Sequence, residues 1–139
     1  MEKIKIKVAV EVGATMEKVW DTWVNPEHMI HWNFASSDWH CPSASNDLSI
    51  GGFSNVRMEA KDGSFGFDLK CVYEIIEPHK RLNSRMEDDR KIEITFAEQD
   101  GKVLIVEVFE AETENSVELQ QMGWQAILNN FKNYVERMK

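Results

Sequence analysis

The amino-acid sequence predicts an α+β fold, in which a curved antiparallel sheet of about six to seven strands wraps around a long C-terminal helix. Three observations lead to this prediction. The chain opens on a strict alternation of apolar and polar residues, its middle carries a series of strand-like segments separated by turn signals, and its end carries a helical apolar stripe. No linker or repeat divides the chain, so we expect one domain over residues 1–139.

The N-terminal part predicts one strand and two short helices. Apolar residues alternate with lysine and glutamate in KIKIKVAVEV, residues 3–12, as in a strand with one buried face. The spacing then becomes helical in TMEKVWDTWV, residues 15–24, where Thr15 is a good N-cap. A second short helix is expected in NPEHMIHW, residues 25–32, with Asn25 as N-cap and Pro26 at the first helical position. Residues 33–47 have neither spacing and are expected to form a loop.

The middle and the end of the chain predict a meander followed by a helix. Between Leu48 and Glu112, strand-like segments are joined by turn signals such as Asp62-Gly63 and Asp100-Gly101, which favour hairpins. The last segment, residues 116–138, has helical spacing. Its apolar stripe consists of Trp124, Ile127, Leu128, Phe131, Tyr134, Val135 and Met138. This stripe needs an apolar partner, and the concave face of the sheet is the largest available, so helix and sheet enclose either a core or a cavity.

Composition excludes several classes of function. The formal net charge is −8 and no basic stripe is present, so we expect neither a nucleic-acid partner nor an anionic membrane partner. The chain has only two cysteines, Cys41 and Cys71, and no apolar stretch of the length that crosses a bilayer or begins a signal peptide. We therefore expect a cytoplasmic protein with reduced thiols.

Four segments, in this order, resemble the START-like superfamily, also called SRPBCC, Bet v allergen-like or helix-grip. They are TMEKVWDTWVNPEHMIHW, DLSIGGFSNVRMEAKDG, YEIIEPHKRL and GWQAILNNFKNYVE. Within the superfamily, the chain resembles the family named after the activator of the heat-shock-protein-90 ATPase. The resemblance implies a helix-grip fold, but this scaffold carries lipid and sterol carriers, hormone receptors, polyketide cyclases and chaperone regulators. Ser54 and Asn55 depart from the bulky or charged residues that the family often has after Phe53.

The segment PEHMIHWNFASSDWHC, residues 26–41, concentrates histidine, tryptophan and cysteine. His28 and His31 are three apart on a predicted helix, and His40 and Cys41 follow, but these spacings match no standard zinc pattern. Adjacent residues such as His40 and Cys41 rarely form a nucleophile–base pair, because the partner normally comes from elsewhere in the fold. We therefore expect no metal, no cofactor and no catalytic nucleophile.

Acid–base chemistry inside a cavity is harder to exclude. The candidate residues are Asn55, Arg57, Tyr73, Glu93 and Glu107. The sequence leaves open whether the face with Asn55 and Arg57, or the face with Ser54, Val56 and Met58, is concave. If the face with Asn55 and Arg57 is concave, these two residues would be polar anchors for a ligand in an apolar cavity.

We expect the protein to bind a small hydrophobic molecule, such as a lipid, polyketide or aromatic metabolite. The expected wall residues are Trp32, Trp39, Phe67, Tyr73, Phe109, Trp124, Leu128 and Phe131. In the resembling fold, Trp32 and Trp39 would flank the mouth, where they could stack on a ligand or simply plug the end. The alternatives are a cyclase- or dehydratase-like enzyme and a module that regulates a chaperone ATPase. We expect no chaperone partner, since the N-terminal binding domain of the founding member has no counterpart here; a homodimer is left open.

Overall fold

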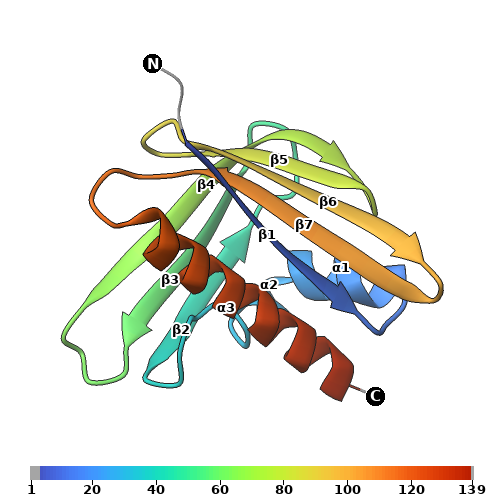
Figure 1. The fold of residues 1–139 in the computed structure, drawn as a ribbon, viewed down its shortest axis with the longest axis horizontal. Coiled ribbons are helices and arrows are strands. Elements are labelled where there is room, and N and C mark those ends of the chain that lie inside the picture. The colour runs from blue at the N-terminus through green and yellow to red at the C-terminus, as the bar shows by residue number, and fades with distance from the viewer. Residues whose placement is uncertain (1–3, 139) are drawn as a thin grey trace.

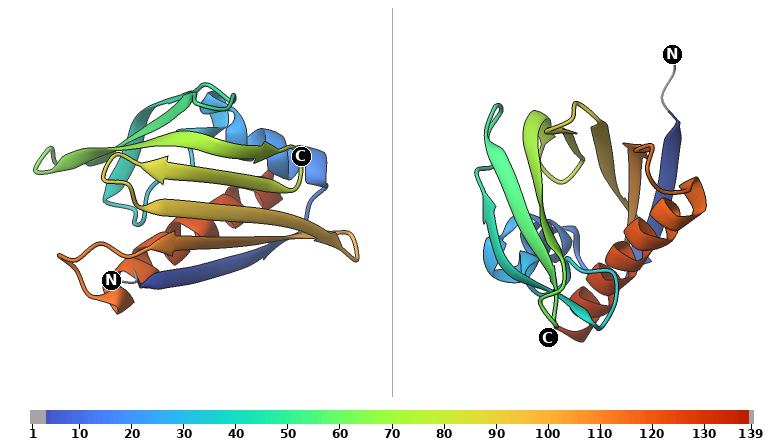
Figure 2. Two further views of the ribbon diagram at one scale, coloured as in Figure 1. Left: turned by 90° about the horizontal axis from the view of Figure 1, so that it is seen from above. Right: turned by 90° about the vertical axis from the view of Figure 1, so that its left-hand side faces the viewer.

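The computed structural model describes residues 4–138 and confirms the α+β helix-grip fold (Figure 1). One antiparallel sheet of seven strands, in the order β1-β7-β6-β5-β4-β3-β2, curls around helix α3 (Figure 2). The elements are β1 Lys5–Val12, α1 Met16–Val24, α2 Pro26–Met29, β2 Trp39–Asn46, β3 Phe53–Ala60, β4 Gly66–Glu77, β5 Arg81–Met86, β6 Lys91–Gln99, β7 Lys102–Glu110 and α3 Val117–Arg137.

The N-terminal helices begin where their caps predict. The Thr15 side chain accepts a hydrogen bond from the backbone N–H of Lys18, and Asn25 does the same for Glu27. Asn25 also ends α1, so α2 follows it at once, with Pro26 at its start. The two helices lie at one end of the curled sheet (Figure 1).

Strand β1 forms one edge of the sheet, and α3 covers that edge. The Gln125 side chain donates a hydrogen bond of 2.9 Å to the carbonyl of Ala9, and Lys132 Nζ donates one of 2.7 Å to the carbonyl of Glu11. The backbone N–H of Gly13 donates to the Glu136 carboxylate at 2.7 Å. Polar residues of α3 therefore satisfy backbone groups of β1 that would otherwise be open to another strand.

The prediction of a loop over residues 33–47 was wrong, because Trp39–Asn46 forms strand β2 at the other edge of the sheet. Its register against β3 shifts between His40 and Ser43, where Pro42 lies. Proline donates no hydrogen bond, and it is tolerated in a sheet at edges and bulges. The mostly polar strand lacks the alternation by which strands are recognised, so its sequence does not distinguish it from a loop.

Glycine is required where β3 begins. A Cβ atom at Gly52 would overlap the carbonyl oxygen of Asp47, while the Gly52 carbonyl accepts a 3.0 Å hydrogen bond from the backbone N–H of Tyr73. The predicted hairpin at Asp100-Gly101 is also present. Both residues have positive φ angles, 52° and 78°, and they join the paired Gln99 and Lys102.

The apolar stripe of α3 faces a filled core in its C-terminal half and a cavity in its N-terminal half. Towards the C-terminal end, Phe131 and Val135 are fully buried. The Phe131 ring lies 4.9 Å from that of Trp23 and 4.8 Å from that of Trp32, measured between centroids, so this half of the helix belongs to a filled core. Towards the N-terminal end, Trp124 stacks on Phe109 at 3.8 Å, and the space beyond it is a cavity. None of the helices within residues 4–138 is both long and apolar enough to cross a membrane.

Candidate functional site

A cavity of about 550 Å³ lies between the concave face of the sheet and α3. Strands β3 to β7 contribute its floor, the first half of α3 contributes one wall, and Trp23, Met29 and Trp32 close its inner end. Most of the floor is apolar. The volume lies within the range of pockets that bind small organic ligands.

The cavity is open to solvent at the end away from α1 and α2. Phe65 and Phe67 line it near the β3–β4 turn, yet they are 62% and 42% exposed. The rest of this rim comes from Arg90 in the β5–β6 turn and from residues 112–115 before α3. An entrance with exposed aromatic rings gives an apolar ligand a surface to contact before it is enclosed.

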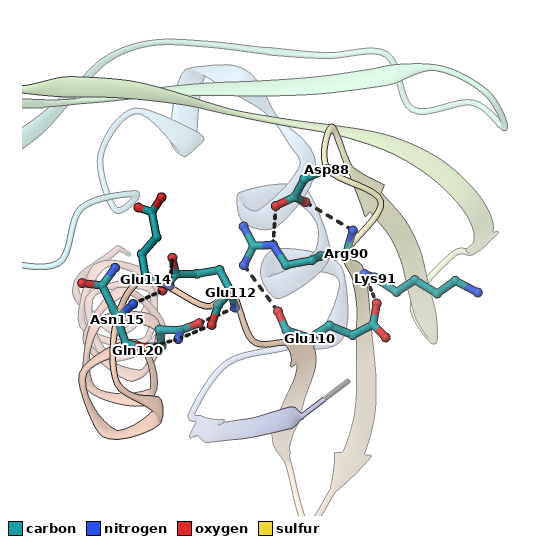
Figure 3. Close-up of polar contacts among 8 residues, drawn as sticks. All are labelled: Asp88, Arg90, Lys91, Glu110, Glu112, Glu114, Asn115 and Gln120. Carbon is teal, nitrogen blue, oxygen red and sulfur yellow. Dashed lines mark hydrogen bonds and ion pairs between the residues drawn. The ribbon is translucent and has the colours of Figure 1, made fainter. Parts of the chain in front are cut away.

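A hydrogen-bond network holds the segment between β7 and α3 at the rim (Figure 3). Gln120 is buried, accepts a bond from the backbone N–H of Glu112, and donates to the carbonyls of Glu112 and Asn115. The Glu112 carboxylate in turn accepts from the backbone N–H groups of Glu114 and Asn115. Although partial desolvation acts to raise it, these backbone bonds lower the pKa of Glu112 below its ordinary value. The rim segment is thus a defined turn.

Arg90 lies beside the end of β7, next to this rim segment, and is already paired (Figure 3). Its Nε atom donates to the Asp88 carboxylate at 2.6 Å, and Nη1 donates to the carbonyl of Glu110 at 3.4 Å. The guanidinium therefore links the β5–β6 turn to the end of β7. Because Asp88 neutralises it, Arg90 adds little net positive charge to the entrance.

Glu107 is the most unusual residue of the cavity floor. It is 8% exposed and lines the cavity from the middle of β7. Its neighbours on the concave face are Val8 and Ile94 across the sheet, with Ile105 and Phe109 on either side along the strand. Burial among these side chains raises the pKa of the Glu107 carboxyl to about 8. Among the described residues, none forms a hydrogen bond or ion pair with this carboxyl.

The remaining polar groups of the floor are smaller or already bonded. The Tyr73 hydroxyl donates to Asn46 Oδ1 at 2.7 Å, and burial raises its pKa to about 12. Burial likewise raises the pKa of the Cys71 thiol, which has Ser54 and Ser84 as hydrogen-bond partners, to about 11. Cys41 is buried outside the cavity lining and its pKa is also raised to about 11. Neither thiol is therefore activated as a nucleophile.

The structure brings four of the ten expected ligand-binding residues into the cavity lining: Trp32, Phe67, Tyr73 and Trp124. Three others lie in the core instead, since Phe109, Leu128 and Phe131 are each at most 1% exposed. Trp39 lies outside the lining, but its ring is 6.0 Å from those of both Phe65 and Phe67, so it supports the aromatic side of the entrance.

Asn55 and Arg57 lie on the convex face of the sheet, so the cavity has no access to these two expected anchors. Ser54, Val56 and Met58 take the concave face of β3. Arg57 Nε is 2.9 Å from the Glu59 carboxylate, and Nη1 is 3.6 Å from that of Asp68. Glu93, another acid–base candidate, is exposed on the convex face of β6. Of the five acid–base candidates, only Tyr73 and Glu107 therefore face the cavity.

The histidine-rich segment does not converge on one point. His28 Nδ1 is 2.8 Å from the Tyr134 hydroxyl, and the His31 ring stacks on that of Tyr134. His40 lies at β2, with Nε2 3.7 Å from the Glu59 carboxylate. Over residues 4–138, no three histidine, cysteine or acidic side chains are grouped as a metal ion would require.

Comparisons with known proteins agree with this architecture. The family model described as Activator of Hsp90 ATPase homolog 1-like protein matches residues 13–136. The solution structure of an AHSA1-like protein from Aeromonas hydrophila is 41% identical, with a TM-score of 0.85, and the match covers 94% of this chain and 92% of that one. A protein of Cytophaga hutchinsonii is 45% identical, with a TM-score of 0.79 and coverages of 96% and 92%.

A more distant structure extends the likeness of fold alone. A protein of Chromobacterium violaceum is only 20% identical but has a TM-score of 0.85, with 97% of this chain and 99% of that chain covered. A search of curated proteins returned no match.

Proposed function

We propose that this chain, which belongs to the family of Activator of Hsp90 ATPase homolog 1-like proteins and encloses a cavity between its sheet and α3, binds a small hydrophobic ligand in that cavity. The observation that carries the proposal is the open, mostly apolar cavity of about 550 Å³. Side chains fill the interior beside Phe131 and leave no space there, but they do not fill the region beside the first half of α3. A folded protein of this size needs no cavity for stability, since unfilled apolar space costs free energy.

Copurification is the direct test of this function. The protein is isolated from cells without detergent and analysed by native mass spectrometry, and thermal-shift screens with lipids and aromatic polyketides follow. We expect a bound organic molecule, or an increase in melting temperature with one of these classes. A protein that carries nothing and responds to none of them would contradict the proposal.

Filling the cavity is expected to abolish binding while preserving the fold. Ile127 lines the cavity from α3, so Ile127→Trp places an indole in the ligand's volume. We expect affinity for any copurified or screened ligand to fall by about tenfold or more, measured by isothermal titration calorimetry. Leu119→Trp is the matched control, because Leu119 is on the same helix but is 55% exposed and outside the lining. Equal loss of affinity in both variants would show that the ligand binds elsewhere.

A cyclase- or dehydratase-like activity is the second candidate. It is favoured by the buried carboxyl of Glu107, which shares the cavity with the hydroxyl groups of Ser54 and Ser84. A carboxyl with a pKa near neutrality can give or take a proton at physiological pH. Incubation with aromatic polyketides, with products followed by mass spectrometry, tests this candidate. Unchanged polyketides would exclude it for that substrate class and leave the binding function in place.

A further inference from the structure

Glu107 is a buried ionisable group, and none of the residues that the structure describes forms a hydrogen bond or ion pair with its carboxyl. It lies among Val8, Ile94, Ile105 and Phe109 on the floor of the cavity, in the part of the sheet that α3 covers. An unpaired carboxyl in such a place is costly, whether charged or neutral, because water is replaced by hydrocarbon. A single polar group in an apolar pocket is also how many binding sites fix the orientation of a ligand.

We propose that the cavity takes a hydrophobic amine, whose protonated nitrogen lies against the carboxylate of Glu107 while its apolar part fills the space beside Trp124 and Ile127. This inference rests on the proposed ligand-binding function and adds to it the chemical class of the ligand. Once the ligand's charge has ionised it, the carboxylate only accepts hydrogen bonds, so its partner in the complex must be a donor. A cationic donor forms the stronger bond, and the apolar surroundings strengthen it further.

The charges at the entrance favour the same ligand. The ionisable side chains at the rim are Arg90 from the β5–β6 turn and Glu112 and Glu114 from the segment before α3, whereas Asp68 of β4 is paired with Arg57 at 3.6 Å. Arg90 is neutralised by Asp88 at 2.6 Å, which leaves the entrance net negative. A negative entrance attracts a cation and repels a carboxylate. A fatty acid would meet this repulsion at the rim.

The other groups that face Glu107 do not compete for this role. From β4, Cys71 and Tyr73 face the cavity with pKa values raised by burial, so both are neutral near pH 7. Strands β3, β5 and β6 contribute only serine and apolar side chains to the lining. The lining residues of α3 are Gln120, Trp124 and Ile127, and those near α1 and α2 are Trp23, Met29, Trp32 and Asn33. Glu107 is therefore the one buried acid that a ligand meets among the described lining residues.

The proposal predicts that binding of an amine releases a proton. Burial raises the pKa of Glu107 to about 8, so the empty cavity holds mostly the protonated acid at pH 7. An ammonium group beside it favours the ionised form, and the carboxyl proton leaves to the buffer. An uncharged alcohol has no such effect. Proton release can be measured on the wild-type protein, without any substitution.

Three ligands with one aromatic skeleton test the inference: naphthylmethylamine, naphthylmethanol and naphthoic acid. Titration calorimetry at pH 7, in two buffers of different ionisation enthalpy, gives both affinity and protons released. We expect the amine to bind about tenfold or more tighter than the alcohol and to release a proton, and the acid to bind weakest. Glu107→Gln should bind amine and alcohol alike and release no proton. Glu93→Gln, which removes the same charge from the convex face, should behave as the wild type.

Different results contradict the two proposals. If the alcohol binds as tightly as the amine, or if Glu107→Gln keeps the wild-type preference, the amine inference is overturned and the binding function stands. If none of the three compounds binds, the inference is likewise overturned, whereas the binding function is judged by the copurification experiment and by Ile127→Trp. Circular dichroism tests whether Glu107→Gln is folded. If this variant does not fold, the proton release of the wild-type protein alone decides whether the amine binds at Glu107.

Discussion

Raising the pH from about 4.5 to about 8 is expected to destabilise the empty protein, and Glu107→Gln is expected to remove this part of the loss. The pKa of Glu107 is raised from 4.5 to about 8 by burial. Between these values the folded protein keeps a proton that the unfolded chain has released, so the free energy of unfolding falls as the pH rises. At about 1.4 kcal/mol per pKa unit, the decrease is at most of the order of 5 kcal/mol.

Urea unfolding at a series of pH values measures this effect. The wild type should lose stability steadily over the interval, and the difference between it and Glu107→Gln should be smallest at its acidic end. Glu93→Gln removes an exposed acid from the convex face but keeps Glu107, and it should retain the full pH dependence of the wild type. Parallel curves for the wild type and Glu107→Gln would refute a protonated, buried Glu107.

Phe131→Ala is expected to lower the free energy of unfolding by about 3–5 kcal/mol. The side chain is fully buried, and its ring meets those of Trp23 and Trp32 at centroid distances of 4.9 and 4.8 Å. These three rings join α1, the segment after α2 and α3. Removing the central ring therefore leaves a cavity and loses aromatic contacts between all three parts.

Denaturant unfolding of Phe131→Ala and Met122→Ala at one pH provides the comparison. Met122 is on the same helix and is 68% exposed, so its replacement should change stability by no more than about 0.5 kcal/mol. A loss below about 1 kcal/mol for Phe131→Ala would mean that the aromatic cluster is not the centre of the core.

The elements that the sequence predicts well are those whose two faces differ. Strand β1 alternates at every position but Ala9, and its even-numbered residues from Ile6 to Val12 are buried as expected. The prediction failed for strand β2 because this strand is mostly polar and its register shifts between His40 and Ser43, so no period is visible in its sequence. Strand β3 is the intermediate case. Its strand character was predicted, but both faces are mixed, and only the tertiary structure decides that Val56 faces inward and Arg57 outward.

The candidate site was harder to predict than the fold for the same reason. Helical spacing places Trp124, Ile127, Leu128 and Phe131 on one stripe, but it does not separate residues beside empty space from residues in a filled core. That separation depends on the curvature of the sheet. The sequence of β7 did carry a signal at Glu107, since this acid stands on the same face as Val103, Ile105 and Phe109 in a strand that is otherwise apolar from Val103 to Phe109. A charged residue in an otherwise apolar phase is the pattern that finds this carboxyl.

The pairing of β1 with β7 governs the order in which the chain can fold as it is synthesised. Val12 pairs with Val103 and Lys5 with Glu110, so β1 pairs with a strand that follows it only after β2 to β6. The hairpins of the meander, from β2 to β7, need only neighbouring strands and short loops. During synthesis the apolar face of β1 therefore stays exposed to solvent until β7 and α3 have left the ribosome. Pairing of β1 with β7 is therefore a late, long-range step. It carries the loop-closure entropy of the long chain segment that separates the two strands.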